Sequence, residues 1–125
     1  MNTSQTKIAI CSIGDNPESN VSDRFARCNK YAIYNSETLK FTFIDNEAIN
    51  EMSGAGSKAA RIMSKLGIET LLVPEVGPKA FVALEAFDIK VFKYTNKEKT
   101  VKDTLTDYFE NKLTIVKDHT TKGKH

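Results

Sequence analysis

The chain has 125 residues and a mass of 14.0 kDa, the size of a single domain. Hydrophobic residues make up 40% of it and charged residues 27%, which is enough apolar material to fill a core without disulfides or a structural metal. The 18 Lys and Arg residues outnumber the 16 Asp and Glu residues by two, and this excess lies within residues 117–125. The rest of the chain is charge-balanced, which disfavours binding to nucleic acids.

Apolar runs reach only about five residues, far fewer than the ~20 needed to span a bilayer. The first residues are polar and contain no apolar segment typical of a secretory signal. We therefore expect a cytoplasmic protein with no membrane segment. No repeat or linker divides residues 7–116, so we expect one domain over this range, with flexible ends at 1–6 and 117–125.

The first element predicted along the chain is a strand at residues 7–13. Both of its faces are mostly apolar, which is typical of a central strand covered on both sides by helices. Residues 14–20 are rich in Gly, Asp, Asn, Pro and Ser, so a long loop follows.

Two further strands are predicted at residues 31–36 and 39–45, joined by a tight turn. The second alternates apolar and polar residues and indicates an antiparallel hairpin at a sheet edge. The residues expected to face inward are Leu39, Phe41 and Phe43.

A helix is predicted after the turn Gly54-Ala55-Gly56, with Gly67 as its stop signal. Its apolar face comprises Ala55, Ala59, Ile62, Met63 and Leu66. A buried strand at residues 70–74 follows, and a second helix is predicted from Gly77-Pro78, because proline suits the first helical turn.

The last elements are a strand at residues 90–94 and a helix that begins with a capping sequence at Thr100. The residues that this helix is expected to bury are Val101, Leu105, Tyr108 and Phe109. Together the elements predict an α/β fold with a five-stranded mixed sheet and helices on both faces. The strand at 31–36 should run antiparallel to those at 7–13 and 70–74, because a tight loop cannot join parallel neighbours.

Enzyme motifs are missing from the sequence. The two histidines, His119 and His125, lie in the C-terminal end, so the rest of the chain has no imidazole for acid–base or triad chemistry. No glycine-rich nucleotide-binding motif is present, and residues 7–13 contain no carboxylate that could hold a nuclease's Mg²⁺. We therefore expect a binding protein rather than an enzyme.

Candidate ligand contacts gather where parallel strands end. Ligands of open α/β sheets bind beyond the carboxyl ends of these strands, where the strands at 7–13 and 70–74 lead into loops. Arg24 and Arg27 lie three residues apart and, with backbone amides near Gly14 and Gly77, would suit an anionic ligand. Solvated arginines on a surface turn are the alternative interpretation.

Three sulfur-containing residues are candidate soft metal ligands. Cys28 is the strongest candidate, with a buried thiol as the alternative. Cys11 and Met52 are further candidates, for which a core residue and a loop-anchoring side chain are the alternatives. The two cysteines form neither a CxxC redox pair nor a zinc-binding pattern.

Four segments resemble one known family in their order and spacing. They are the strand from Lys7, the segment Val21-Ser22-Asp23-Arg24-Phe25-Ala26-Arg27-Cys28, the turn at Gly54, and residues 66–84. Over roughly residues 7–116 the chain resembles the dinitrogenase iron-molybdenum cofactor biosynthesis family, whose NifX-like domains also form the carboxy-terminal part of NifB proteins. It departs from the family pattern at Ala26, where the family has glycine, and at residues 50–53, where many members have histidine.

The resemblance implies a ribonuclease-H-like fold and a non-enzymatic role in binding and carrying an iron–sulfur or molybdenum-containing cluster. Such clusters are anionic, which would give the two arginines a function. The expected cofactor-binding residues are Gly14, Ser22, Arg24, Arg27, Gly54, Gly56 and Gly77, and the expected metal ligands are Cys28, Cys11 and Met52. The implied partners are metal-cluster assembly or acceptor proteins.

We expect a monomer, because the helices account for the apolar faces of the sheet. The alternative function is a metal-free regulatory or protein-interaction domain that works through residues 14–30. A hydrolase or nuclease on the same fold is disfavoured by the first strand, which has no carboxylate.

Overall fold

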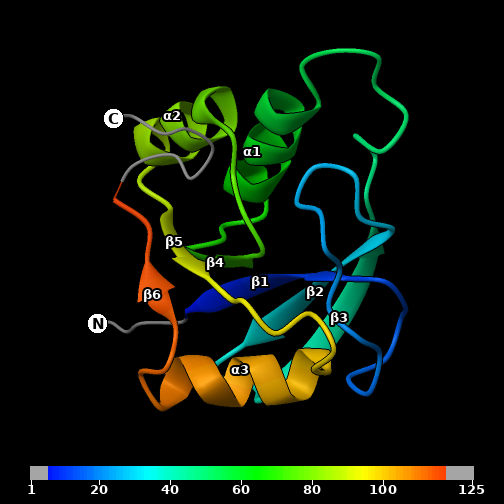
Figure 1. Ribbon diagram of the computed structural model, residues 1–125, viewed down its shortest axis with the longest axis vertical. Coiled ribbons are helices and arrows are strands. Elements are labelled where there is room, and N and C mark those ends of the chain that lie inside the picture. Colours follow the sequence, from blue (N-terminus) through cyan, green and yellow to red (C-terminus); the bar gives the residue numbers. More distant parts are fainter. Residues whose placement is uncertain (1–5, 118–125) are drawn as a thin grey trace.

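The computed structural model describes residues 6–117, which form a six-stranded sheet with three helices (Figure 1). The strands are β1 (Lys7–Ser12), β2 (Lys30–Asn35), β3 (Lys40–Asp45), β4 (Thr70–Val73), β5 (Lys90–Lys93) and β6 (Thr114–Ile115). The helices are α1 (Ala55–Lys65), α2 (Pro78–Ala86) and α3 (Val101–Phe109). The expected flexible ends fall mainly on residues 1–5 and 118–125, which lie outside the described residues, as do His119 and His125.

The sheet has the strand order β3-β2-β1-β4-β5-β6 and mixes parallel with antiparallel pairs. β1 and β4 are the parallel central pair, β5 extends it in parallel through the β4-α2-β5 unit, and β2 and β3 form an antiparallel hairpin at one edge. These pairings confirm the predicted mixed sheet and the predicted direction of the second strand.

The prediction of five strands was wrong by one. β6 pairs antiparallel with the end of β5, where Thr114 lies opposite Lys93 and Ile115 opposite Phe92. β6 has only two residues, both exposed, which is too short for the alternation of apolar and polar residues that indicates a strand.

Two helices cover one face of the sheet and one helix covers the other (Figure 1). Side chains of a strand alternate between its two faces, so each central strand supplies both cores. The core beneath α1 and α2 includes Ala9, Cys11, Leu71 and Val73, whereas the core beneath α3 includes Ile8, Ile10 and Leu72.

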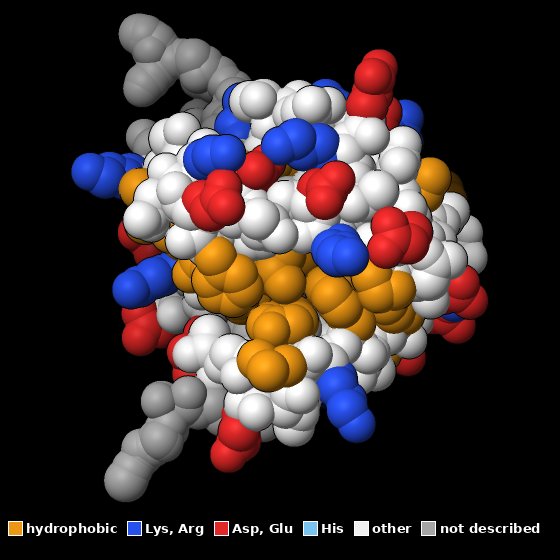
Figure 2. All heavy atoms as spheres, turned by 90° about the horizontal axis from the view of Figure 1, so that it is seen from below, with side chains coloured by type: hydrophobic (Ala, Val, Ile, Leu, Met, Phe, Trp, Pro, Cys, Tyr) orange, Lys and Arg blue, Asp and Glu red, His pale blue; other side chains and the backbone are white. Residues whose placement is uncertain are grey.

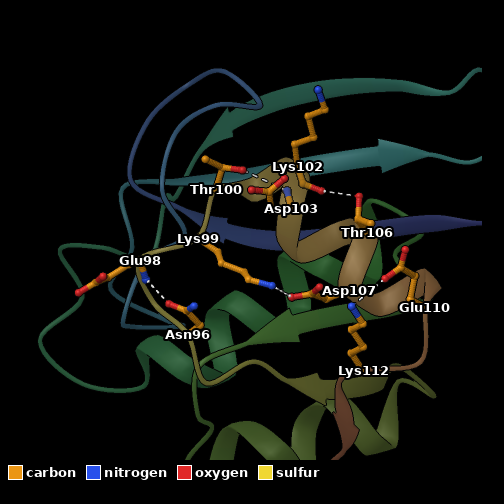
Figure 3. A network of polar contacts seen from close by, with 10 residues as sticks. All are labelled: Asn96, Glu98, Lys99, Thr100, Lys102, Asp103, Thr106, Asp107, Glu110 and Lys112. Carbon is orange, nitrogen blue, oxygen red and sulfur yellow. Dashed lines mark hydrogen bonds and ion pairs between the residues drawn. The ribbon is translucent and has the colours of Figure 1, made fainter.

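Polar contacts fix the start and the outer side of α3 (Figure 3). The side chain of Thr100 accepts a hydrogen bond of 3.1 Å from the backbone N–H of Asp103, which confirms the predicted cap. Lys99, just before the helix, forms an ion pair with Asp107 in the second turn of α3. The contacts leave the apolar side of the helix facing the sheet.

Two hydrophobic side chains, Leu39 and Phe109, are more exposed than the sequence predicted. Leu39 is 71% exposed and lies in the hairpin turn rather than in β3, and Phe109 at the end of α3 is 53% exposed, so both were wrongly expected to be buried.

An aromatic layer lies on the α3 face of the sheet. Ring centroids 5.0–6.0 Å apart link, in succession, Phe43, Phe41, Tyr34, Phe109, Tyr108 and Phe92. Seen from the α3 side, hydrophobic side chains gather in a band bordered by charged side chains (Figure 2).

The helices α1 and α2 pack closely at their first turns. A Cβ atom placed on Gly56 would lie 2.8 Å from the Cβ atom of Ala80, closer than two carbon atoms approach in proteins. Because the Cβ of Ala80 is attached directly to the backbone, it cannot swing away as a longer side chain could. Glycine at position 56 therefore sets how closely the two helices approach.

We predict that Gly56→Ala destabilises the fold by about 1–3 kcal/mol, the usual cost of overpacking. The more favourable helix propensity of alanine offsets part of this cost. Gly77→Ala is the matched control, because a Cβ at Gly77 would meet no atom within 4 Å and the backbone φ there is −77°. Urea unfolding of both variants measures the difference. Equal stabilities would contradict the helix contact.

Candidate anion-binding site

The loop between β1 and β2 is anchored at the carboxyl end of β1 by Ser22. The backbone N–H of Ser22 donates to the carbonyl of Cys11 at 2.9 Å, and the Oγ of Ser22 accepts from the N–H of Arg24 at 3.1 Å. The hydroxyl of Tyr94 donates to the carbonyl of Ser22. Since Ser22 is only 5% exposed, its role in the structure is to hold the loop against the sheet.

A cavity of about 450 Å³ lies between this loop and the start of α2. The loop contributes residues 23–27, α1 contributes Gly56, and the turn after β4 with the first turn of α2 contributes residues 75–80. This is the end of the sheet at which the parallel strands β1 and β4 terminate, the position expected for a ligand site.

Two helix N-termini meet at this cavity. α1 begins after Gly54 and α2 after Gly77, and neither helix has a side-chain cap or an acidic residue in its first turn. The first N–H groups of a helix have no intrahelical acceptor and carry a partial positive charge. Anions bind readily at such positions.

Basic side chains add to this positive potential. Arg24, Arg27 and Lys79 line the cavity, and Asp23 and Glu75 oppose them, so side chains contribute one net positive charge. Nη1 of Arg27 donates to the carbonyl of Ile49 at 3.0 Å, which ties this arginine to the loop after β3. The cavity is therefore positive both from its side chains and from the two helix ends.

Four of the predicted ligand-binding residues line this cavity: Arg24, Arg27, Gly56 and Gly77. Gly14, Ser22 and Gly54 lie outside the lining, and the N–H of Gly14 already donates to Oγ of Ser12 at 3.2 Å. Met52 is 96% exposed and also lies outside the lining.

The two cysteines lie behind the cavity lining, inside the core. Cys11 is fully buried and Cys28 is 2% exposed, with its thiol 3.2 Å from the carbonyl of Phe25. The Cys11 thiol hydrogen bonds to Cys28, which lowers the pKa of Cys28 because the bond stabilises the thiolate. Burial raises the pKa of Cys11, so Cys28 is the thiol of this pair that ionises first.

Residues 6–117 contain no group of three or more His, Cys, Asp or Glu side chains placed to hold a metal ion. In the same range no helix has the length and apolar character needed to cross a membrane. At the cavity the described residues offer cationic side chains, two carboxylates and backbone amides, and the rest of the lining is mainly apolar.

Residues 6–111 match the family model for dinitrogenase iron-molybdenum cofactor proteins. The chain belongs to this family. It is 33% identical over 76 residues to an uncharacterized protein of Methanocaldococcus jannaschii, a match that covers 58% of this chain and 64% of that relative's length.

Two solved structures of other proteins share this fold. The apo orange protein of Desulfovibrio gigas superposes with a TM-score of 0.88 at 27% identity, covering 96% of this chain and all of that chain. An NMR structure of a proposed NifB protein from Thermotoga, of the DUF35 family, superposes with a TM-score of 0.81 at 31% identity, covering 94% and 99% of the two chains.

Asn46 supports the site of this family member but was not singled out by the sequence. Its Nδ2 donates to the carbonyls of Ala26 and Cys28 at 2.8 and 2.9 Å, and its Oδ1 accepts from the N–H of Ala48 at 2.9 Å. Asn46 is 3% exposed, so it fixes the end of the arginine-bearing loop from within the core. An asparagine after a strand predicts a turn, and its long-range partners have no sequence signal. Lys79 was also missed, although it directly follows Gly77-Pro78.

We predict that Asn46→Ala lowers the free energy of unfolding by about 2–3 kcal/mol, because it leaves buried carbonyls unpaired. Asn46→Asp should be at least as harmful, since a carboxylate has no N–H to donate to them. Hydrogen exchange at residues 24–28 should accelerate in both variants. Unchanged exchange there would show that the loop is held by other contacts.

Stability should fall in alkaline solution because of Tyr31 and Tyr94. Burial raises the pKa of both phenols well above the usual value, so the folded chain retains protons that the unfolded chain releases above about pH 10. Their contribution to stability is full below that pH and is lost as the pH rises, at up to about 1.4 kcal/mol per pH unit for each phenol. Tyr94→Phe should therefore show a shallower decline than the parent in unfolding experiments between pH 9 and 12, whereas parallel curves would rule out this cause.

Proposed function

We propose that this chain binds an anionic metal–sulfur cluster, containing iron or molybdenum, as cargo in the 450 Å³ cavity. The role is that of a carrier in cofactor biosynthesis or trafficking, without turnover of a substrate. The observation that carries the proposal is the convergence of two uncapped helix N-termini and two arginines on one cavity.

The chemistry of the lining matches such a cargo. Metal sulfides carry several negative charges spread over their sulfur atoms, which accept hydrogen bonds from guanidinium and amide N–H groups. Each helix N-terminus contributes about half a positive charge. Because the helix dipoles are fixed by the fold before an anion binds, they lower the cost of burying it there.

The lining residues would have different roles in binding. Arg27, held by its hydrogen bond to Ile49, would contact the cluster from a fixed position, and Arg24 would close over it from the exposed side of the loop. Gly77 would let the cluster approach the backbone closely, since no side chain occupies that space.

The sulfur ligands would act only if the loop moves. Cys28 is the best candidate for a thiolate bond, and its lowered pKa favours the form that binds metals. Its burial means that the segment carrying Arg24 to Cys28 would have to open first. Cys11 would then be a neighbouring second thiol, whereas Met52 could contribute only from the exposed loop before α1.

Family membership supports this proposal, as does the structural similarity to the orange protein and to the proposed NifB protein. We further propose that the partners are cluster-assembly and acceptor proteins, that the chain works as a cytoplasmic monomer, and that its sheet is of the ribonuclease-H-like type.

The experiment is anaerobic reconstitution of the full chain with iron, sulfide and molybdate, followed by metal analysis and visible spectra. We predict that Arg24→Ala/Arg27→Ala retains at most a tenth of the parent's cluster, because each lost charge-assisted hydrogen bond is worth about 1.5–3 kcal/mol. Cys28→Ser removes the thiol and keeps both arginines. Loss of the cluster in this variant would indicate a thiolate bond, whereas retention would indicate charge contacts.

Arg61→Ala/Lys65→Ala is the matched control, because it removes two cations outside the cavity lining. It should retain the cluster like the parent. Equal retention by the Arg24/Arg27 variant would refute this site. A parent that holds no cluster would favour the metal-free interaction domain.

A further inference from the structure

The two edges of the sheet are protected to different degrees. β6, at one edge, has two residues, whereas β3, at the other, has six and pairs with β2 in continuous register without a bulge or a proline. Proteins usually shorten, cover or distort an edge strand so that no other chain pairs with it. β3 has none of these protections from the described part of the chain.

One hydrogen bond shows which groups of β3 point outward. The N–H of Asn46 donates to the carbonyl of Asn29, which continues the register between β2 and β3. Hydrogen-bonded pairs alternate along an antiparallel ladder, so the backbone groups of Phe41, Phe43 and Asp45 point toward the free edge. No strand of residues 6–117 pairs with them there.

A second cavity, of about 690 Å³, runs along this edge between β3 and α1. Its apolar lining includes Ile44, Ile62 and Leu66. Its cationic lining residues are Lys58, Arg61 and Lys65, all from α1. A strand added to β3 would direct every second side chain toward this row of cations.

The cationic row is only partly neutralised within the described residues. Lys58 forms an ion pair with Glu51 at 2.9 Å, whereas Arg61 and Lys65 form none with any residue in the range 6–117. α1 itself contains no acidic residue.

The acidic residues of the lining do not balance this charge. Asp45 is already paired with Lys30 at 2.6 Å, which leaves Glu47 as the unpaired acidic side chain among the described lining residues. The charge of the groove therefore favours an acidic occupant.

A second copy of this chain fits the edge poorly. Pairing β3 with itself about a two-fold axis would place the α1 rows of the two copies on the same face of the joined sheet, near each other. Arg61 and Lys65 of one copy would then face the same residues of the other. Like charges placed opposite each other at such an interface disfavour the pairing.

We propose that the free edge of β3 binds an extended segment of a partner protein, which adds as a seventh strand and alternates acidic with apolar side chains. The acidic side chains lie against Arg61 and Lys65 on the α1 face, and the apolar side chains extend the aromatic layer beside Phe41 and Phe43 on the α3 face. This surface is separate from the cluster cavity and does not depend on the cargo.

The test uses the full ¹⁵N-labelled chain and a capped ten-residue peptide of alternating valine and glutamate. Amide exchange at Phe41, Phe43 and Asp45 should slow at least tenfold at saturating peptide. Thr42 and Ile44, whose N–H groups already bond to β2, should change much less. Arg61→Glu/Lys65→Glu should weaken binding at least tenfold and should bind the corresponding valine–lysine peptide instead.

Lys90→Glu/Lys97→Glu, with the same charge change outside this groove, is the control and should bind the glutamate peptide like the parent. The proposal is overturned if millimolar peptide slows no exchange at β3, or if protection appears on another element. It is also overturned if light scattering shows that the free chain is a dimer and an edge substitution, Phe43→Pro, separates it. Cluster loading enters none of these measurements, so they succeed or fail independently of the cargo.

Discussion

The close approach of α1 and α2 at their first turns is the contact on which the candidate site depends. Gly56 of α1 has no side chain to hold that helix away from Ala80 of α2. Both helix N-termini therefore lie at the same cavity. Two helix ends of like partial charge repel each other, and neither carries an acidic residue or a side-chain cap to offset this. The apolar contacts beneath the helices hold the arrangement, and an anion in the cavity would relieve its electrostatic cost.

Local patterns predicted most of the fold because its central strands carry strong signals. β1 and β4 are apolar on both faces, which indicated a sheet covered by helices, and the start of α2 at Gly77-Pro78 follows from the geometry of proline. The failures have equally local causes. Leu39 continues the alternation of β3 but adopts a φ of 61° in the hairpin turn. Phe109 is the last residue of α3, and although its ring contacts Tyr34 of β2, it remains 53% exposed.

The site was predictable where it follows from topology and not where it follows from packing. Ligands of open α/β sheets bind beyond the carboxyl ends of the parallel strands, and this rule indicated Arg24, Arg27 and Gly77. The structure brings these three residues to one cavity. The burial of Cys28 depends on how the loop folds back, which Asn46 and Tyr94 enforce from positions distant in sequence. Such long-range hydrogen bonds leave no pattern in a single sequence.

Helix α1 connects the two proposed surfaces. Its first turn lines the cluster cavity through Gly56, and its outer row, with Arg61 and Lys65, lines the groove beside β3. A partner strand on β3 would therefore contact the helix that shapes the cargo site without covering the cavity itself. Because Gly56 of α1 lies directly against Ala80 of α2, a shift of α1 relative to α2 toward an acidic partner would change the spacing of the two helix N-termini and with it their attraction for an anion.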